Sequence, residues 1–144
     1  MNKINVDGVP AELKIFKQWV CWKFEYPDGE TDVNGVPVKP TKVPYNPAMN
    51  RKASVVDRFT WATFNECVAG LDRYDGIGFV LTAQDPYVVM DLDACSNQED
   101  YDKMVNYYTR LNSFTEISPS GTGSHVWVKA TISKGRNKRP FELR

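Results

Sequence analysis

The sequence predicts an α+β fold in which a mixed, largely antiparallel sheet is flanked by helices. Short runs rich in aromatic and β-branched residues predict the strands, and one longer segment repeats apolar residues at helical spacing. The 144 residues, of which 42% are hydrophobic, are enough to bury a sizeable core. We therefore expect a single domain over 1–144, with an N-terminal α/β part at about 1–75 and a second, sheet-forming part at about 76–144.

The first part of the chain alternates between strand-like, loop-like and helix-like segments. Residues 19–26 are rich in aromatic and β-branched side chains, which predicts a strand. Residues 27–50 are polar and contain several Gly and Pro residues, which predicts a hairpin or loop. Residues 58–70 predict a helix, and its inner side is expected to carry Phe59, Phe64 and Val68.

The second part of the chain is predicted to form most of the sheet and one long helix. The helix at 98–111 is predicted because apolar side chains recur at helical spacing: Tyr101, Met104, Val105, Tyr108 and Leu111. The Asp85-Pro86 pair predicts a turn that joins the first two strands of this part as a hairpin. The strands are expected at 77–82, 87–92, 113–118 and 125–131.

Composition and cysteine usage exclude several classes of protein. No apolar run is long enough to span a membrane, and the N-terminal residues lack the apolar core of a signal peptide, so we expect a cytoplasmic protein with no membrane partner. Cys21, Cys67 and Cys95 are scattered and form no Cys-x-x-Cys pair. We therefore expect buried or partly buried thiols rather than a disulfide framework or a zinc site.

A pair of carboxylates closes one predicted strand. Asp91 and Asp93 stand at i and i+2 around Leu92, and residues two apart in a strand share a face. Together they could hold a divalent cation such as Mg²⁺, which prefers carboxylate and phosphate oxygens. The same pattern is also typical of a turn whose carboxylates accept hydrogen bonds from backbone amides.

A glycine- and serine-rich segment precedes the only histidine of the chain. Its two glycines, Gly121 and Gly123, allow the positive φ angles with which backbone N–H groups can surround an anion. His125 then opens an alternating strand and could contact a phosphate oxygen, although an ordinary hairpin loop with a structural histidine has the same pattern. A single histidine excludes nucleases built on paired histidine ligands and His-Glu-x-x-His proteases. The candidate nucleotide-binding residues are Ser118, Ser120, Gly121, Thr122, Gly123, Ser124 and His125.

The charge distribution bears on whether the chain binds nucleic acid. A net charge of zero argues against strong general affinity for a polyanion. Basic residues nevertheless concentrate in 129–144, and a second basic segment covers 39–52, whereas 85–102 is acidic. Solvated loop charges would give the same pattern. The candidate nucleic-acid contacts are Lys39, Lys42, Arg51, Lys52, Lys129, Lys138 and Arg139.

Five ordered segments together resemble the catalytic domain of the archaeo-eukaryotic primase superfamily, in the form found in phage and plasmid primase-polymerases. The segments are Lys-Pro-Thr-Lys-Val-Pro-Tyr-Asn-Pro at 39–47, Thr-Trp-Ala-Thr-Phe at 60–64, Gly-Ile-Gly-Phe-Val-Leu-Thr at 76–82, Asp-Leu-Asp at 91–93 and Ser-Pro-Ser-Gly-Thr-Gly-Ser-His at 118–125. They run in the family's order and extend over most of the chain from Trp19 onward. The resemblance also implies a sheet of the kind found in the family's catalytic core.

The resemblance implies a role for each of the three family motifs. The first motif, an acid pair that ends an apolar strand, falls on Asp91 and Asp93 as ligands of catalytic Mg²⁺ or Mn²⁺. The second falls on Gly123, Ser124 and His125, with glycine in place of the usual serine, and His125 would contact the phosphates of the incoming nucleotide. The third motif, a late acid on a strand, falls on Glu142 as a further metal ligand.

The implied reaction is metal-dependent nucleotidyl transfer from nucleoside triphosphates to a primer, on a single-stranded DNA template, during phage- or plasmid-type replication. Because family catalytic domains continue beyond the third motif, the chain is expected to be truncated after Glu142. Such proteins are often fused to helicases, so a replicative helicase is a further expected partner.

Two other functions are compatible with the same residues. The chain could be a noncatalytic nucleotide- or single-stranded-DNA-binding module that acts as a replication accessory or inhibitor, so whether it is an enzyme stays open at this point. It could also be a metal-dependent nuclease, but the phosphate loop and the single histidine favour nucleotide binding. The placement of Glu142 relative to Asp91 and Asp93 discriminates between an enzyme and a binding module.

Overall fold

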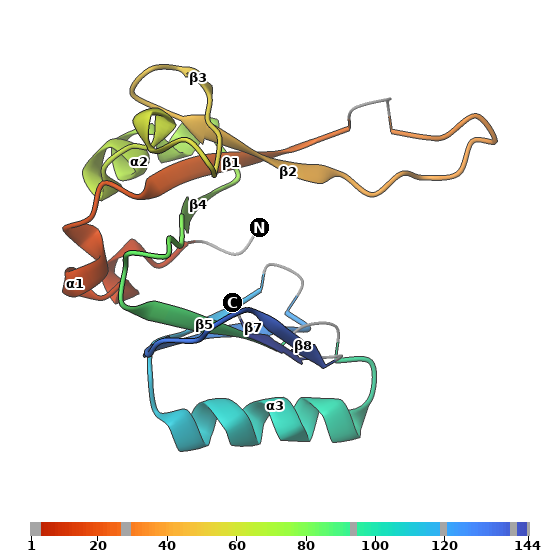
Figure 1. Ribbon diagram of the computed structural model, residues 1–144. Helices are drawn as coiled ribbons and strands as arrows, with labels where there is room; N and C mark the ends of the chain where they lie inside the picture. The colour runs from red at the N-terminus through yellow and green to blue at the C-terminus, as the bar shows by residue number, and fades with distance from the viewer. Residues whose placement is uncertain (1–3, 27–29, 93–94, 119–120, 139–140, 144) are drawn as a thin grey trace. The chain divides into compact units, whose positions relative to one another are not determined.

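The chain folds into two antiparallel sheets, the first accompanied by several short helices and the second, among the described residues, by one long helix (Figure 1). This confirms the predicted α+β class. The computed structural model describes residues 4–26, 30–92, 95–118, 121–138 and 141–143, with the backbone alone for 136–138 and 141–143. The chain divides into two compact units, Lys3–Val80 and Leu81–Arg144. None of the helices that the structure describes is both long and apolar enough to cross a membrane.

The unit Lys3–Val80 contains a sheet with the strand order β3-β2-β1-β4. The central pairing joins β1 and β2 over five register pairs, from Cys21 opposite Tyr45 to Glu25 opposite Thr41. The strands are β1 (Trp19–Glu25), β2 (Thr41–Asn46), β3 (Arg51–Lys52) and β4 (Gly76–Phe79). The helical elements are η1 (Val6–Gly8), α1 (Ala11–Lys14), η2 (Arg58–Thr60), α2 (Phe64–Gly70) and η3 (Leu71–Arg73).

Aromatic packing between β1 and α2 forms one side of the first core. The Trp19 ring meets the rings of Phe64 and Phe79 edge to face, with centroids 4.9 and 5.2 Å apart. Beside them Cys21 and Cys67 are fully buried, and the Cys21 thiol donates to the Cys67 carbonyl oxygen at 3.6 Å. None of the three cysteines is in a disulfide. Cys21 and Cys67 are buried and Cys95 is partly buried, as the sequence predicted.

Helix α2 begins later than predicted. Trp61 and Ala62 are extended instead of helical, because Ala62 forms a bridge with Trp19 of β1. Thr63 then starts the helix with a capping box: its side chain accepts from the Glu66 N–H, and Glu66 accepts from the Thr63 N–H. The predicted helix at 58–70 is therefore wrong at 61–63, where the chain is extended between the 3₁₀ helix η2 and α2. Phe59, expected on the inner side, is 76% exposed.

Strand β2 lies within the segment 27–50 that the sequence predicted as a hairpin or loop. Pro44 lowers the strand propensity of this segment, because proline has no N–H to donate to a neighbouring strand. The segment is a strand nevertheless, because β1 pairs with it throughout and β3 pairs only with Tyr45 and Asn46. Tertiary pairing thus overrides the local propensity.

The unit Leu81–Arg144 contains a sheet with the strand order β6-β7-β5-β9-β8. The longest pairing joins β5 and β7 over six register pairs, from Tyr87 opposite Lys129 to Leu92 opposite Ser124. The elements are β5 (Tyr87–Leu92), α3 (Gln98–Leu111), β6 (Thr115–Ile117), β7 (Ser124–Lys129), β8 (Arg136–Lys138) and β9 (Phe141–Leu143). Helix α3 runs along one face of this sheet (Figure 1).

Helix α3 and strand β5 have the bounds that the sequence predicted. The Asn97 side chain accepts from the Asp100 N–H at the start of the helix, and Asn112 ends it in the left-handed conformation at φ 44°. Leu92, Val126 and Met104 form the buried cluster between the sheet and the helix. Strands β6 and β7 differ from their predicted bounds by one to two residues at each end.

The predicted hairpin between 77–82 and 87–92 is wrong. Strand β4 pairs with β1 in the first sheet, whereas β5 pairs with β7 and β9 in the second. The turn between them exists: the Asp85 carboxylate accepts from the backbone N–H groups of Thr82 and Tyr87. A local turn therefore separates two sheets here instead of joining two paired strands.

Candidate active site

One row of residues crosses the second sheet and contains one candidate residue from each of the three motifs. Asp91 on β5 lies directly opposite His125 on β7, and Glu142 on β9 lies opposite Asp91 on the other side. Glu116 on β6 continues the row, because it lies opposite His125. Positions far apart in the sequence are thus brought together by strand register.

The alternation of the strands puts this row on the face that α3 does not cover. Leu92 and Val126 pack against Met104 of α3. Asp91 and His125 are their neighbours in sequence, and successive residues of a strand point to opposite faces. The apolar and polar positions of β5 and β7 therefore separate into a helix-facing core and a polar row.

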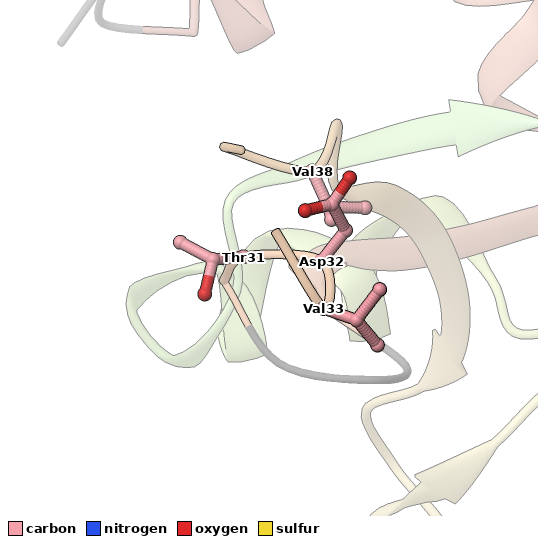
Figure 2. Close-up of a pocket in the computed structure, with 4 residues that line it drawn as sticks. All are labelled: Thr31, Asp32, Val33 and Val38. Atoms are coloured by element: carbon pink, nitrogen blue, oxygen red, sulfur yellow. The ribbon is translucent and has the colours of Figure 1, made fainter. Parts of the chain in front are cut away.

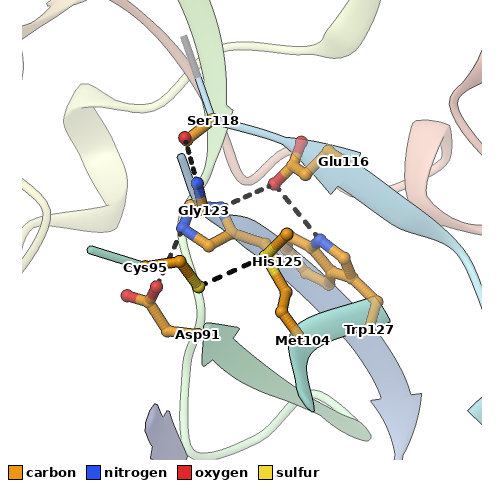
Figure 3. A network of polar contacts seen from close by, with 8 residues as sticks. All are labelled: Asp91, Cys95, Met104, Glu116, Ser118, Gly123, His125 and Trp127. Carbon is orange, nitrogen blue, oxygen red and sulfur yellow. Dashed lines mark hydrogen bonds and ion pairs between the residues drawn. The ribbon is translucent and has the colours of Figure 1, made fainter. Parts of the chain in front are cut away.

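His125 stands between two carboxylates (Figure 3). Its Nε2 lies 3.4 Å from Asp91 Oδ1, and its Nδ1 lies 3.1 Å from Glu116 Oε1. The side chain of Asp91 is only 8% exposed, whereas that of His125 is 39% exposed. A buried carboxylate needs a polar or charged partner, and His125 provides one.

Glu116 is the residue of this network that sequence reasoning missed. Its Oε1 also accepts a hydrogen bond from the Trp127 indole N–H at 3.3 Å (Figure 3). The signal that could have revealed it is register: a short connection between two predicted strands brings Ile117 opposite Ser124 and hence Glu116 opposite His125.

The connection between β6 and β7 is closed by hydrogen bonds between its two ends. The Ser118 N–H donates to the Gly123 carbonyl oxygen at 2.9 Å, and the Gly123 N–H donates to Ser118 Oγ at 3.0 Å (Figure 3). Gly121 adopts φ +75°, a left-handed conformation that favours glycine. Thr122 lies in the same connection and accepts from the Cys95 N–H through its carbonyl oxygen.

One of the predicted nucleotide-binding serines lies on the opposite face of the sheet from His125. Ser124 is 1% exposed and lies opposite Leu92, so its side chain is on the helix-facing side of the sheet and away from the row of His125. Ser120 lies outside the described residues.

The predicted metal ligands are described only in part. Asp91 is fully described, Asp93 lies outside the described residues, and Glu142 is described by its backbone position alone. Among the described side chains, no group of three His, Cys, Asp or Glu residues could hold a metal ion. The donor set itself, carboxylate oxygens from adjacent strands, is chemically suited to Mg²⁺ or Mn²⁺.

The predicted nucleic-acid contacts fall into two groups, one in each unit. In the first unit Lys42 lies over the Trp22 ring, with Nζ 4.4 Å from its centroid, and also within 5.9 Å of the Phe24 centroid. Lys52 is paired with Glu25 at 3.1 Å. Lys39, Arg51 and Lys129 are exposed, Lys138 is described by its backbone alone, and Arg139 lies outside the described residues.

A shallow surface depression in the connection between β1 and β2 is not a candidate site. Figure 2 shows that it is lined by Thr31, Asp32, Val33 and Val38. The Asp32 carboxylate accepts from the N–H groups of Asn34 and Val36 at 2.8 and 3.0 Å, which is the bonding of a turn. The one ionisable group among its described lining residues is therefore already bonded to the backbone.

Comparison with known proteins relates the chain to a replication enzyme of a phage. The chain is 39% identical over 131 residues to the DNA primase-polymerase of Nitratiruptor phage NrS-1. The match extends over 86% of this chain but only 16% of the relative, so the chain spans about a sixth of that protein's length. No family model matches the chain.

Proposed function

We propose that the chain is the nucleotidyl-transfer core of a primase-polymerase, which adds nucleotides to a primer on a single-stranded DNA template. The observation that carries this proposal is the row in which His125, Asp91 and Glu142 occupy adjacent strands of one sheet. The primase-polymerase relationship, with 39% identity over most of this chain, supports the same function.

The expected metal ligands are the carboxylates of Asp91, Asp93 and Glu142. Bound Mg²⁺ or Mn²⁺ would supply Lewis-acid stabilisation of the charge that develops on the reacting phosphate oxygens. Asp91 is suited to this role because its carboxylate is held in place: it is almost buried, and His125 contacts it from the next strand.

The residues of the β6–β7 connection would bind the triphosphate. His125 Nε2 is on the Asp91 side of the ring, so a phosphate bound near Asp91 would lie within its reach. The N–H groups of Gly121 and Gly123 donate to Ser118 in this structure, so they would reach the outer phosphates only by exchanging these bonds for bonds to the nucleotide. These residues would position the nucleotide before the reaction, which is the larger part of catalysis in phosphoryl transfer.

Single-stranded DNA would contact the exposed face of β1 and β2 in the first unit. Phe24 is 43% exposed beside the partly buried Trp22, and the Lys42 ammonium lies over both rings. Aromatic rings that stack on bases beside a cation that meets phosphates are the usual features of a single-strand contact. A helicase partner remains a prediction from the resemblance alone.

The test is extension of a labelled primer on a single-stranded template with Mg²⁺ or Mn²⁺, for ribonucleotides and deoxyribonucleotides separately. We expect product with the parent chain and a loss of at least about 100-fold with Asp91→Ala/Asp93→Ala, because the proposed metal ligands are removed. The control is Asp102→Ala, an exposed carboxylate on α3 that bonds only Gln98 among the described residues.

Absence of product from a folded parent chain would contradict self-sufficient catalysis. If metal-dependent nucleotide binding then survives in the parent and is lost in Asp91→Ala/Asp93→Ala, the chain is a binding module instead. Equal extension by the parent and the double variant would overturn the proposed site.

A further inference from the structure

The row that contains His125 includes a carboxylate to which the proposed chemistry gives no role. Glu116 Oε1 lies 3.1 Å from His125 Nδ1 and 3.3 Å from Trp127 Nε1 (Figure 3). An indole N–H can only donate, and an ionised carboxylate can only accept. The same logic makes Nδ1 of His125 the donor in its contact with Glu116.

We propose that Glu116 is a positioning residue for His125: it fixes the imidazole with Nδ1–H toward β6 and Nε2 toward Asp91. This inference rests on the proposed function for its consequence, because Nε2 is then the nitrogen presented to the phosphates of a nucleotide. The contacts of Glu116 with His125 and Trp127 are observed in the structure and do not depend on that function.

The half-exposed imidazole needs such a partner to keep one orientation. His125 is 39% exposed, so packing alone leaves the ring free to rotate about its last side-chain bond. A rotation by 180° about this bond would put ring carbons at the positions of the two nitrogens, so that Nδ1 would no longer face Glu116 and Nε2 would no longer face Asp91. A hydrogen bond to one nitrogen determines which atom faces the other side, as it does for histidines that bind metals.

Trp127 in turn holds Glu116. The Glu116 side chain is 47% exposed and would otherwise sample several rotamers, whereas the Trp127 ring is 9% exposed. The indole N–H donates to the same carboxylate oxygen that His125 contacts. Three side chains from β6 and β7 therefore form one hydrogen-bonded chain, and the far nitrogen of His125 lies 3.4 Å from Asp91 Oδ1.

The first experiment measures which nitrogen of the imidazole carries a proton and does not require catalytic activity. His125 is the only histidine, so protein labelled with ¹⁵N-histidine has a single pair of imidazole nitrogen signals. In metal-free parent protein at one fixed pH, we expect Nδ1 to carry a proton. Glu116→Ala should move the proton population toward Nε2, and Glu116→Gln, which keeps an acceptor oxygen, should retain the parent pattern.

The second experiment is a double-mutant cycle on nucleotide binding, measured with a nonhydrolysable nucleoside triphosphate and Mg²⁺. We expect Glu116→Ala to weaken binding about 10-fold, which is typical for loss of a partner that orients a ligand-binding histidine. In the His125→Ala background the same change should have no further effect, because there is no ring left to orient. Glu99→Ala is the matched control, since Glu99 is paired with Lys103 on the surface of α3.

The two experiments separate failure of this inference from failure of the proposed function. An imidazole spectrum that is the same in parent and Glu116→Ala protein overturns the positioning role, whatever the chain binds. If His125→Ala loses nucleotide binding and Glu116→Ala does not, the function holds and the positioning role fails. If no variant affects nucleotide binding while the spectrum changes as expected, the positioning role holds and the proposed function fails.

Discussion

Individual residues of the site differ in how well they could be foreseen. Asp91 and His125 stand out because each has a local signature: an acid that ends an apolar strand, and a histidine that follows a glycine-rich loop. Glu116 has no such signature and resembles any polar residue on an exposed strand face. Its relation to His125 depends on which strands pair and in what register, and the residue type of Glu116 carries no signal of that pairing.

A pH dependence of stability follows from Glu25 on β1. Tyr45 donates a hydrogen bond to its carboxylate, and Lys52 pairs with it at 3.1 Å, so both partners lower the pKa of Glu25 below its ordinary value of 4.5. A carboxyl whose pKa is depressed on folding stabilises the folded state above its unfolded pKa. That contribution is lost as the pH falls through the depressed pKa of the folded state.

The measurement is the free energy of unfolding of parent and Glu25→Gln protein by urea at several pH values between 7 and 3. We expect the parent to be more stable above pH 4.5 and the difference to shrink below it. Tyr45→Phe should reproduce part of this effect, because the hydrogen bond from Tyr45 is the largest cause of the lowered pKa. A difference that stays constant across this range would contradict the assignment.

Single elements were predictable where the sequence carries both periodicity and end signals. Helix α3 has apolar residues at helical spacing, an Asn cap at its start and a left-handed Asn at its end, and its predicted bounds are confirmed. Strand β2 and the start of α2 were mispredicted, because pairing with β1 decides both of them. The expected hairpin between β4 and β5 is wrong for a related reason. The Asp85-Pro86 pair indicates that the chain changes direction, but it does not determine which strands pair with each other.

A graded loss of stability is expected along the inner face of α3. Met104 is 2% exposed in the cluster with Leu92 and Val126, so Met104→Ala should cost about 2–5 kcal/mol of unfolding free energy. The comparison is Leu111→Ala on the same helix, where the side chain is 39% exposed and the cost should be much smaller. Urea denaturation followed by circular dichroism measures both, and equal costs would mean that α3 does not pack as described.

The whole molecule combines two separately cored units with a net charge of zero. Neither property favours strong nonspecific attraction to nucleic acid, since such attraction requires an excess of basic side chains. The described basic side chains predicted to contact nucleic acid are few, and one of them, Lys52, forms an ion pair with Glu25. Binding to single-stranded DNA should therefore depend on a small number of cations beside aromatic rings rather than on a broad positive field.

The salt dependence of DNA binding tests this expectation. Each phosphate neutralised on a single strand contributes about −0.7 to the slope of log affinity against log salt concentration, so we expect a shallow slope for the parent chain. Lys42→Ala should weaken binding and make the slope shallower still, because Lys42 is the cation above Trp22 and Phe24. Lys103→Ala, which removes a cation paired with Glu99, should change neither. An unchanged slope in Lys42→Ala would exclude this lysine from the contact.

The closed connection between β6 and β7 has a consequence for how this protein can vary. Its hydrogen bonds join Ser118 to Gly123, and this span sets Ile117 opposite Ser124 and therefore His125 opposite Glu116. Substitutions that keep the length of the span and the bonds between Ser118 and Gly123 leave that alignment intact. Insertion or deletion of a single residue would shift one strand past the other and replace His125 by a side chain from the opposite face. Related sequences should therefore tolerate changes of composition in this connection far better than changes of its length.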